Sequence, residues 1–304
     1  MYRKPILLAV VVFVGLLTAC GQATNAFGEI ANKPDAEAQP TAGQAGGVQP
    51  VVTTSELVVG PNRMALGLIE NNVPIPDAAQ TRVHVRFFKL KGDQARLVSE
   101  EDAQYYGEGL GARGTFVTHP TFDTPGEWGL EVQMKRPGKP ASTQRLGLEV
   151  AQKGSAVPIG ARAPRSKTPT AAQVKDLRTI TSASNPDPRL YRLSVDQAVT
   201  SEKPSMILFA TPGFCQTAVC GPGVDVLDRL ANKFGDKVNA VHVEVYQYPF
   251  ERLKPVKTMD EWGLQTEPWL FLVDKTGHIA ARFEGGITYP EIEPEVAKLM
   301  QRTN

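Results

Sequence analysis

The chain has few residues of the types that mark metal sites and disulfide frameworks. Its 304 residues include only three cysteines and four histidines. The histidines, His84, His119, His242 and His278, are far from one another in the sequence, so none has the spacing of a zinc site. Three cysteines are also too few for a small domain that depends on several disulfides.

An excess of charge of one sign is lacking as well. Lys and Arg number 33 against 32 for Asp and Glu, which leaves a net charge of +1. This balance gives no electrostatic basis for binding nucleic acid. A glycine-rich phosphate loop and a serine nucleophile elbow are absent from the sequence. We therefore expect no nucleic-acid partner and no bound cofactor.

Long apolar runs are lacking except near the start of the chain. The run Ile6 to Leu17 follows the basic residues Arg3 and Lys4 and ends just before Cys20. A run of about twelve residues is too short to span a bilayer, which takes about twenty, but it is typical of a signal peptide. We expect residues 1–19 to be a signal peptide, with Cys20 either incidental or part of the processing site.

The residues Leu17-Thr18-Ala19-Cys20 resemble the lipobox of bacterial lipoproteins. The resemblance implies that Cys20 is lipidated with more than one acyl chain and anchors the protein stably to the extracytoplasmic face of the cell membrane. Two cysteines, Cys215 and Cys220, then remain in an oxidising compartment.

The next two segments differ in composition. Residues 20–54 are rich in Ala, Gln, Gly, Pro and Thr, which predicts a disordered tether. In residues 55–151, apolar and polar residues alternate and turn residues recur, which predicts a β-sandwich. The expected strands are Glu56–Val59, Met64–Ile69, Arg82–Leu90, Gly114–Thr118, Trp128–Met134 and Arg145–Val150. The segment 122–132 resembles the end of immunoglobulin-like domains in bacterial copper-resistance and oxidase-assembly proteins, which implies an immunoglobulin-like sandwich.

Residues 152–170 contain Pro158, Pro164 and Pro169 and are expected to form a Pro/Gly linker. Beyond it, near-helical spacing predicts a helix over 170–184, and the pair Ser194 and Gln197 predicts a capped short helix. Apolar runs then predict four strands and helical spacing predicts three helices. The strands are expected at Ser205–Ala210, Val238–Val245, Trp269–Val273 and Ile279–Phe283, with helices after Cys220, at Met259–Leu264 and from Tyr289.

This order of elements, with the sequence Phe209 to Cys215, Pro268 before a strand and the Val273 to Gly277 turn, resembles the thioredoxin family. The resemblance implies an α/β thioredoxin-like domain over 171–304. It also implies that Cys215 is the attacking thiol and Cys220 the resolving one, and that Pro268 is a cis-proline facing them. A helix N-terminus beside a sulfur favours the thiolate, which is the species that attacks disulfides.

The cysteine pair departs from the usual family pattern in its spacing. Four residues separate Cys215 from Cys220, and in a straight helix their Cα atoms would lie about 8.6 Å apart, beyond the roughly 7 Å limit for a disulfide. We therefore expect a turn across Gln216–Val219 and a regular helix from near Pro222. Cys220 would then lie nearer the helix start, so either cysteine remains a candidate for the attacking thiol.

Two further departures concern neighbouring side chains. Phe214 stands where the family usually has tryptophan, and the strand Ser205–Ala210 lacks the buried carboxylate that many members carry. Glu244, on the next strand, is the nearest substitute, although we expect it to face the surface.

Three functions remain open from the sequence. The first is thiol–disulfide exchange or electron transfer with the thiols and disulfides of exported proteins, through Cys215 and Cys220. The second is a non-catalytic interaction lipoprotein in which this pair is a structural disulfide; so small a loop would stabilise the fold by about 2 kcal/mol. The third is a copper chaperone, which would need His242 near both sulfurs.

Overall fold

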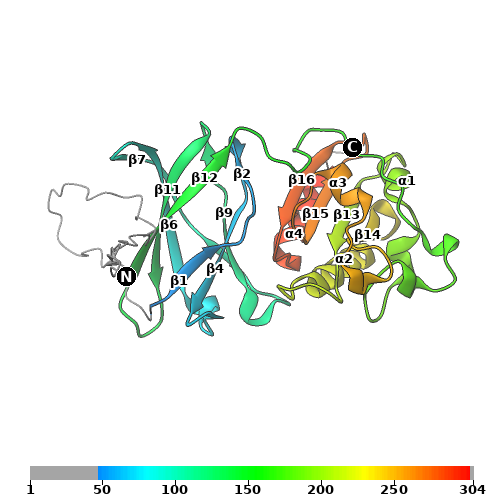
Figure 1. Ribbon diagram of the computed structural model, residues 1–304, viewed down its shortest axis with the longest axis horizontal. Helices are drawn as coiled ribbons and strands as arrows, with labels where there is room; N and C mark the ends of the chain where they lie inside the picture. The colour runs from blue at the N-terminus through cyan, green and yellow to red at the C-terminus, as the bar shows by residue number, and fades with distance from the viewer. Residues whose placement is uncertain (1–46, 302–304) are drawn as a thin grey trace, which may run out of the picture.

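The computed structural model describes residues 47–301. The signal peptide expected at 1–19, the lipidation residue Cys20 and most of the tether expected at 20–54 lie outside the described residues. Figure 1 shows two lobes, one built of strands and one of strands and helices, joined by a single connection after β12. None of the helices within 47–301 is both long and apolar enough to cross a membrane.

The β lobe consists of two five-stranded sheets and a small two-stranded ribbon. Buried side chains from both five-stranded sheets, such as Leu66, Phe116, Phe87 and Trp128, form one shared core. The strands are β1 (Gln49–Val52), β2 (Leu57–Val58), β3 (Gly60–Pro61), β4 (Met64–Glu70), β5 (Val73–Pro74), β6 (Arg82–Lys91), β7 (Gln94–Asp102), β8 (Gln104–Tyr106), β9 (Thr115–Thr118), β10 (Thr121–Phe122), β11 (Gly126–Lys135) and β12 (Ser142–Ala151).

One sheet has the order β1-β4-β9-β8, with β5 paired to β4, and the other has the order β2-β12-β11-β6-β7. The six strands expected from the sequence are present, with shifted ends. The expected tether is too long at its C-terminal end, because residues 49–52 pair with β4 as strand β1. Strand β7 was not expected, since it is polar and largely exposed along its length.

The α/β lobe has a central four-stranded sheet of order β14-β13-β15-β16. Strand β13 is parallel to β14 and antiparallel to β15, which is antiparallel to β16. This is the thioredoxin-like arrangement that the sequence predicts. The elements are α1 (Val195–Val199), β13 (Ser205–Ala210), α2 (Cys220–Phe234), β14 (Asn239–Glu244), α3 (Lys257–Trp262), β15 (Trp269–Val273), β16 (Ile279–Glu284) and α4 (Tyr289–Gln301).

Helices cover both faces of this sheet. Alternate residues of the fully buried strand β13 point to opposite sides, as the pleat requires: Ile207 and Phe209 pack with α1 and α3, whereas Met206 and Leu208 pack with α2 and α4. A strand that is buried on both faces reads as a continuous apolar run, which is why its position could be predicted.

The segment expected as a linker at 152–170 is packed against the α/β lobe along much of its length. Ala156 and Ala163 are buried in the core of that lobe. The backbone N–H of Gly160 donates to the carbonyl of Ile279, and the N–H of Ala163 donates to that of Gly277. The segment 152–170 is therefore part of the α/β lobe and lies beside the edge strand β16.

The helix expected over 170–184 is wrong. The structure has two short 3-10 turns instead, at Ala171–Gln173 and Leu177–Thr179. The side chain of Asp176 accepts the backbone N–H of Arg178 at 3.0 Å, and such local side-chain bonds compete with helix formation. Ser182 is held by the carboxylate of Glu244 at 2.7 Å rather than by a helical carbonyl.

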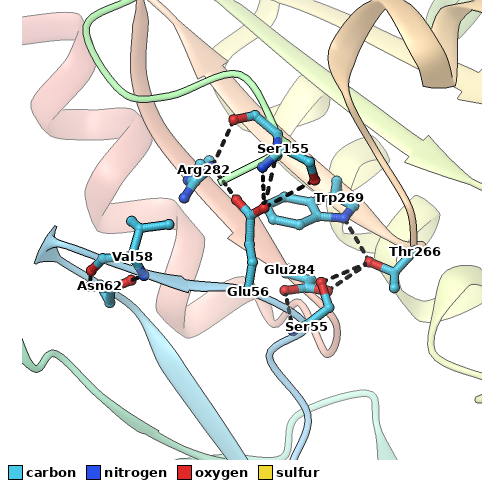
Figure 2. Close-up of polar contacts among 10 residues, drawn as sticks. Ser55, Glu56, Val58, Asn62, Ser155, Thr266, Trp269, Arg282 and Glu284 are labelled. Atoms are coloured by element: carbon cyan, nitrogen blue, oxygen red, sulfur yellow. Dashed lines mark hydrogen bonds and ion pairs between the residues drawn. The ribbon is translucent and has the colours of Figure 1, made fainter. Parts of the chain in front are cut away.

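The two lobes are joined by buried polar contacts. Arg63 of the β lobe pairs with Glu291 of α4 at 2.6 Å, and their side chains are only 8% and 6% exposed. Arg282 of β16 pairs with Glu56 at 2.8 Å, and the same carboxylate accepts the backbone N–H of Ser155 (Figure 2). Charges buried in pairs fix the lobes relative to each other, because separating a pair leaves an unpaired buried charge.

A second chain of contacts in Figure 2 leads from the β lobe toward the loop before β15. The backbone N–H of Ser55 donates to Oε2 of Glu284 at 2.8 Å, and the Thr266 hydroxyl donates to its Oε1 at 2.7 Å. Thr266 in turn accepts from the indole N–H of Trp269 at 3.0 Å. The β lobe thus contacts the loop that carries Glu267 and Pro268.

Candidate functional site

The two cysteines lie between the end of β13 and the first turn of α2. Between them the chain makes a turn in which Ala218 has a φ of 56°, and the helix begins at Cys220. The turn expected across Gln216–Val219 is confirmed, and the helix starts two residues before the expected Pro222. The turn allows Cys215 and Cys220 to approach in spite of their wide spacing.

Cys215 is a partly exposed free thiol at this corner. Its Sγ lies 3.3 Å from the Thr217 hydroxyl. The neighbouring Cys220 thiol lowers the pKa of Cys215 most. Hydrogen bonds from Thr217 and from the backbone N–H groups of Cys220 and Val219 lower it further, and burial opposes them; the result is a pKa of about 4. Cys215 is therefore a thiolate at neutral pH, which is the reactive form.

Cys220 has the opposite environment, since it is fully buried. Its Sγ donates to Oε2 of Glu267 at 2.6 Å. The neighbouring Cys215 thiolate, burial and the contact with Glu267 raise the pKa of Cys220. Cys220 therefore holds its proton, whereas Cys215 is the more exposed and the more acidic of the two thiols.

Glu267 is the carboxylate of the site, and the sequence did not reveal it. Burial raises the pKa of Glu267 to about 7, while the bond from Cys220 lowers it and the charge of Cys215 raises it further. A carboxyl group with such a pKa can accept and return a proton near neutral pH. The one signal available was its place directly before Pro268, in the loop that the thioredoxin resemblance puts opposite the cysteines.

Pro268 has the cis peptide bond that the resemblance implies. The Glu267–Pro268 peptide bond is cis, Pro268 is buried, and its carbonyl accepts the backbone N–H of Gly285 at 2.9 Å. Phe214, which stands in place of the usual tryptophan, packs against Phe250 with ring centroids 6.3 Å apart.

Two expectations about neighbouring residues need correction. Glu244 is 5% exposed rather than on the surface, because its carboxylate accepts both the backbone N–H and the hydroxyl of Ser182. His242 is buried, with one ring nitrogen 2.7 Å from the Tyr191 hydroxyl and the other 3.1 Å from the Ala210 carbonyl. Both nitrogens of His242 are thus engaged within the core, and burial lowers the pKa of His242 to about 4.

Within residues 47–301, the one cluster with metal-ligand geometry consists of Cys215, Cys220 and Glu267, whose ligand atoms lie within 4.8 Å of one another. His242 does not belong to it. Two sulfurs with a histidine are what copper delivery was expected to require, and this set does not provide the histidine. The arrangement fits proton and sulfur chemistry instead.

No protein-family model and no curated protein matches the chain. Among solved structures, the chain is similar to a thiol:disulfide interchange protein of the thioredoxin family from Chlorobium tepidum TLS, at 14% identity over 45% of this chain and 99% of that one, with a TM-score of 0.30. It is similar to the pneumococcal exposed lipoprotein thioredoxin Etrx1 from Streptococcus pneumoniae strain TIGR4, at 17% identity over 33% and 87%, with a TM-score of 0.28.

A third similar structure is CopC from Methylosinus trichosporium OB3b, at 11% identity over 35% of this chain and 98% of that one, with a TM-score of 0.24. Matches at these scores do not establish a function. The thioredoxin-like class of the α/β lobe rests on its strand order and on the position of Cys215, Cys220 and Pro268 within it.

Proposed function

We propose that the protein is a thiol–disulfide oxidoreductase that acts through Cys215 and Cys220. The observation that carries the proposal is the placement of two sulfurs and the Glu267 carboxylate within 4.8 Å of one another at the start of α2. One sulfur is partly exposed and the other is buried. A redox-active pair needs such an asymmetry, because one thiol must be accessible to the client and the other must react only after the mixed disulfide has formed.

In the first step, the Cys215 thiolate attacks one sulfur of a client disulfide. A bond forms between the two sulfurs, the client disulfide breaks, and the second client sulfur leaves as a thiolate that takes a proton from solvent. The thiolate needs no activating base, because the hydrogen bonds at the turn already hold the pKa of Cys215 at about 4.

In the second step, Cys220 attacks the Cys215 sulfur of this mixed disulfide. Glu267 accepts the Cys220 proton across their 2.6 Å contact as the new bond forms. The first client sulfur leaves as a thiolate. The client has then gained two electrons and become a dithiol, and Cys215 and Cys220 have lost two and become a disulfide. The reverse sequence oxidises a client dithiol.

The alternative of a structural staple has less support. A structural disulfide requires neither a cysteine with a lowered pKa, such as Cys215, nor a carboxylate in contact with the other sulfur, such as Glu267 beside Cys220. A disulfide-bonded loop of this size would add only about 2 kcal/mol to a domain that has its own core.

We further propose that the enzyme is anchored by lipid at Cys20 on the extracytoplasmic face of the membrane, and that its clients are the thiols and disulfides of exported proteins. The support is the signal-like segment 1–19 followed by the lipobox-like residues up to Cys20. We also assign the β lobe to the immunoglobulin-like class, because two sheets, antiparallel except for the parallel pair β2 and β12, pack around one core.

Trapping of the mixed disulfide tests the proposed activity. In the variant Cys220→Ser, the first step still occurs but the second cannot. Incubation with a disulfide-containing peptide should give a covalent adduct that dithiothreitol releases, visible by mass spectrometry. Cys215→Ser should give no adduct. If neither variant forms an adduct, the activity is not thiol–disulfide exchange.

A further inference from the structure

A cavity of about 490 Å³ lies between the two lobes, next to the redox centre. Its walls come from both lobes and are mostly apolar. The β lobe contributes residues of β1 and β4 and the segment 112–115 before and into β9, and the α/β lobe contributes Thr217, Val219, Glu267 and the turn after β16. In Figure 1 the β8–β9 connection extends from the β lobe toward α2.

On the β-lobe side, the space of the cavity lies beside the small residue Gly67. Gly67 of β4 lies opposite Val51 of β1 in the sheet, and both line the cavity. A Cβ on Gly67 would meet only a methyl group of Thr53, at 3.9 Å. Val51 is 40% exposed, so an apolar surface is left open beside the space that Gly67 leaves free.

The other end of the cavity reaches the redox centre. Thr217 lines it, and the Thr217 hydroxyl is 3.3 Å from the sulfur of Cys215. Glu267 lines it too, and contacts Cys220. The cavity therefore ends beside both cysteines, and a client bonded to Cys215 has this apolar space next to its cysteine.

We propose that the cavity binds an apolar side chain of the client, carried by an extended segment next to the cysteine that exchanges with Cys215. The proposal rests on the proposed thiol–disulfide exchange and adds the class of client to it. The lining is mostly apolar, so burial of a side chain such as leucine is favourable and burial of a serine is not. The volume exceeds the lower end of the range of ligand pockets, about 300 Å³, and is ample for one large side chain.

The β lobe is held in place for this role by the interface next to the cavity. Glu284 both lines the cavity and accepts the backbone N–H of Ser55, which lines it from the other lobe. The Arg63–Glu291 pair is buried in the same interface. The binding surface is therefore continuous with a fixed contact between the lobes, and the β lobe acts as the second wall of the client site.

The test compares three substrates of the full chain: oxidised glutathione, a peptide disulfide with leucine beside its cysteine, and the same peptide with serine there. We expect the wild-type protein to exchange with the leucine peptide roughly tenfold faster than with the serine peptide, as burial of such a side chain implies. Gly67→Leu fills the cavity and should remove this preference. Val51→Asp places a charge at the cavity from an exposed position that tolerates it, and should also remove the preference.

Gly147→Leu is the matched control. Gly147 is also a strand glycine of the β lobe with open space at its Cβ position, but it does not line this cavity. The variant should keep the preference of the wild-type protein. The proposal is overturned if the wild-type protein exchanges equally fast with both peptides, or if Gly67→Leu and Val51→Asp both keep the preference. If glutathione and both peptides fail to react, the result contradicts the proposed thiol–disulfide exchange as well as the client site.

Discussion

The thiol of Cys220 and the carboxylate of Glu267 lie 2.6 Å apart. The two residues come from different elements, the first turn of α2 and the loop before β15. The strand β13 carries no acid at all, so the partly buried Glu267 is the carboxylate beside the cysteines. The proton of the resolving cysteine has an acceptor in direct contact with it.

Replacing Glu267 with glutamine should slow the resolving step about a hundredfold, since removal of a positioned base typically costs that much or more. In the wild-type protein the rate of this step should rise with pH as Glu267 ionises. The midpoint should lie below about 7, because the negative charge of Cys215 that raises the pKa of Glu267 is absent from the mixed disulfide. The variant should lose that rise. Release of the client thiol from a preformed mixed disulfide, followed by stopped flow, measures the step.

The control for Glu267→Gln is Glu295→Gln, a change of the same kind at a residue of α4 that pairs with Lys298. It should leave the rate and its pH dependence as they are. Equal rates for Glu267→Gln and the wild-type protein would show that Glu267 does not take the proton.

Alkylation of Cys215 by iodoacetamide should be almost independent of pH between about pH 6 and 8, because only the thiolate reacts and the pKa of Cys215 is about 4. The rate should fall by half near that value. Cys220→Ala removes the largest cause of the lowered pKa and should move the midpoint upward, and Thr217→Val should move it by less. A midpoint near the ordinary cysteine value in the wild-type protein would contradict the assigned thiolate.

Loss of the Arg63 side chain should destabilise the protein by about 3–5 kcal/mol, because Glu291 would remain buried without its partner. Unfolding in urea measures the change. Lys298→Ala breaks an exposed pair with Glu295, whose side chains are 60% and 36% exposed, and should cost less than about 1 kcal/mol. If Arg63→Ala costs no more than Lys298→Ala, the interface does not fix the lobes.

The folded state should lose stability as the pH falls from 6.5 toward 4, in part through His242. Burial lowers the pKa of His242 from 6.5 to about 4, so in this window the unfolded chain binds a proton that the folded one does not. The loss from this group amounts to roughly 3 kcal/mol at most. His242→Gln should make the stability less dependent on pH in this window and should leave the trapping of mixed disulfides by Cys215 intact. Loss of trapping in this variant would show that His242 takes part in the reaction.

Much of the α/β lobe could be predicted because its strands are apolar throughout. Ser205–Ala210 and Trp269–Val273 are buried at every position, and a short apolar run of that kind is typical of a strand covered on both faces. The exposed strand β7 gave no such signal, since only its pairing with β6 makes it a strand.

The chemistry of the site could be predicted only where the residue types are rare. Two cysteines beside a strand end are visible in the sequence, whereas Glu267 is one acid among many until the fold brings it to Cys220, 47 positions away. The contact between the lobes is more distant still, since Arg63 and Glu291 lie 228 positions apart. Their pairing depends on how the two lobes pack against each other. Local sequence patterns carry no information on that packing.

A redox titration of the Cys215–Cys220 pair against glutathione tests the central claim most directly. The full chain is equilibrated with mixtures of reduced and oxidised glutathione, its free thiols are alkylated, and the dithiol and disulfide forms are counted by mass. We expect full interconversion at a reduction potential well above about −300 mV, the value below which structural disulfides lie. A pair that never forms the disulfide, or one that stays oxidised at every glutathione ratio, would contradict the account.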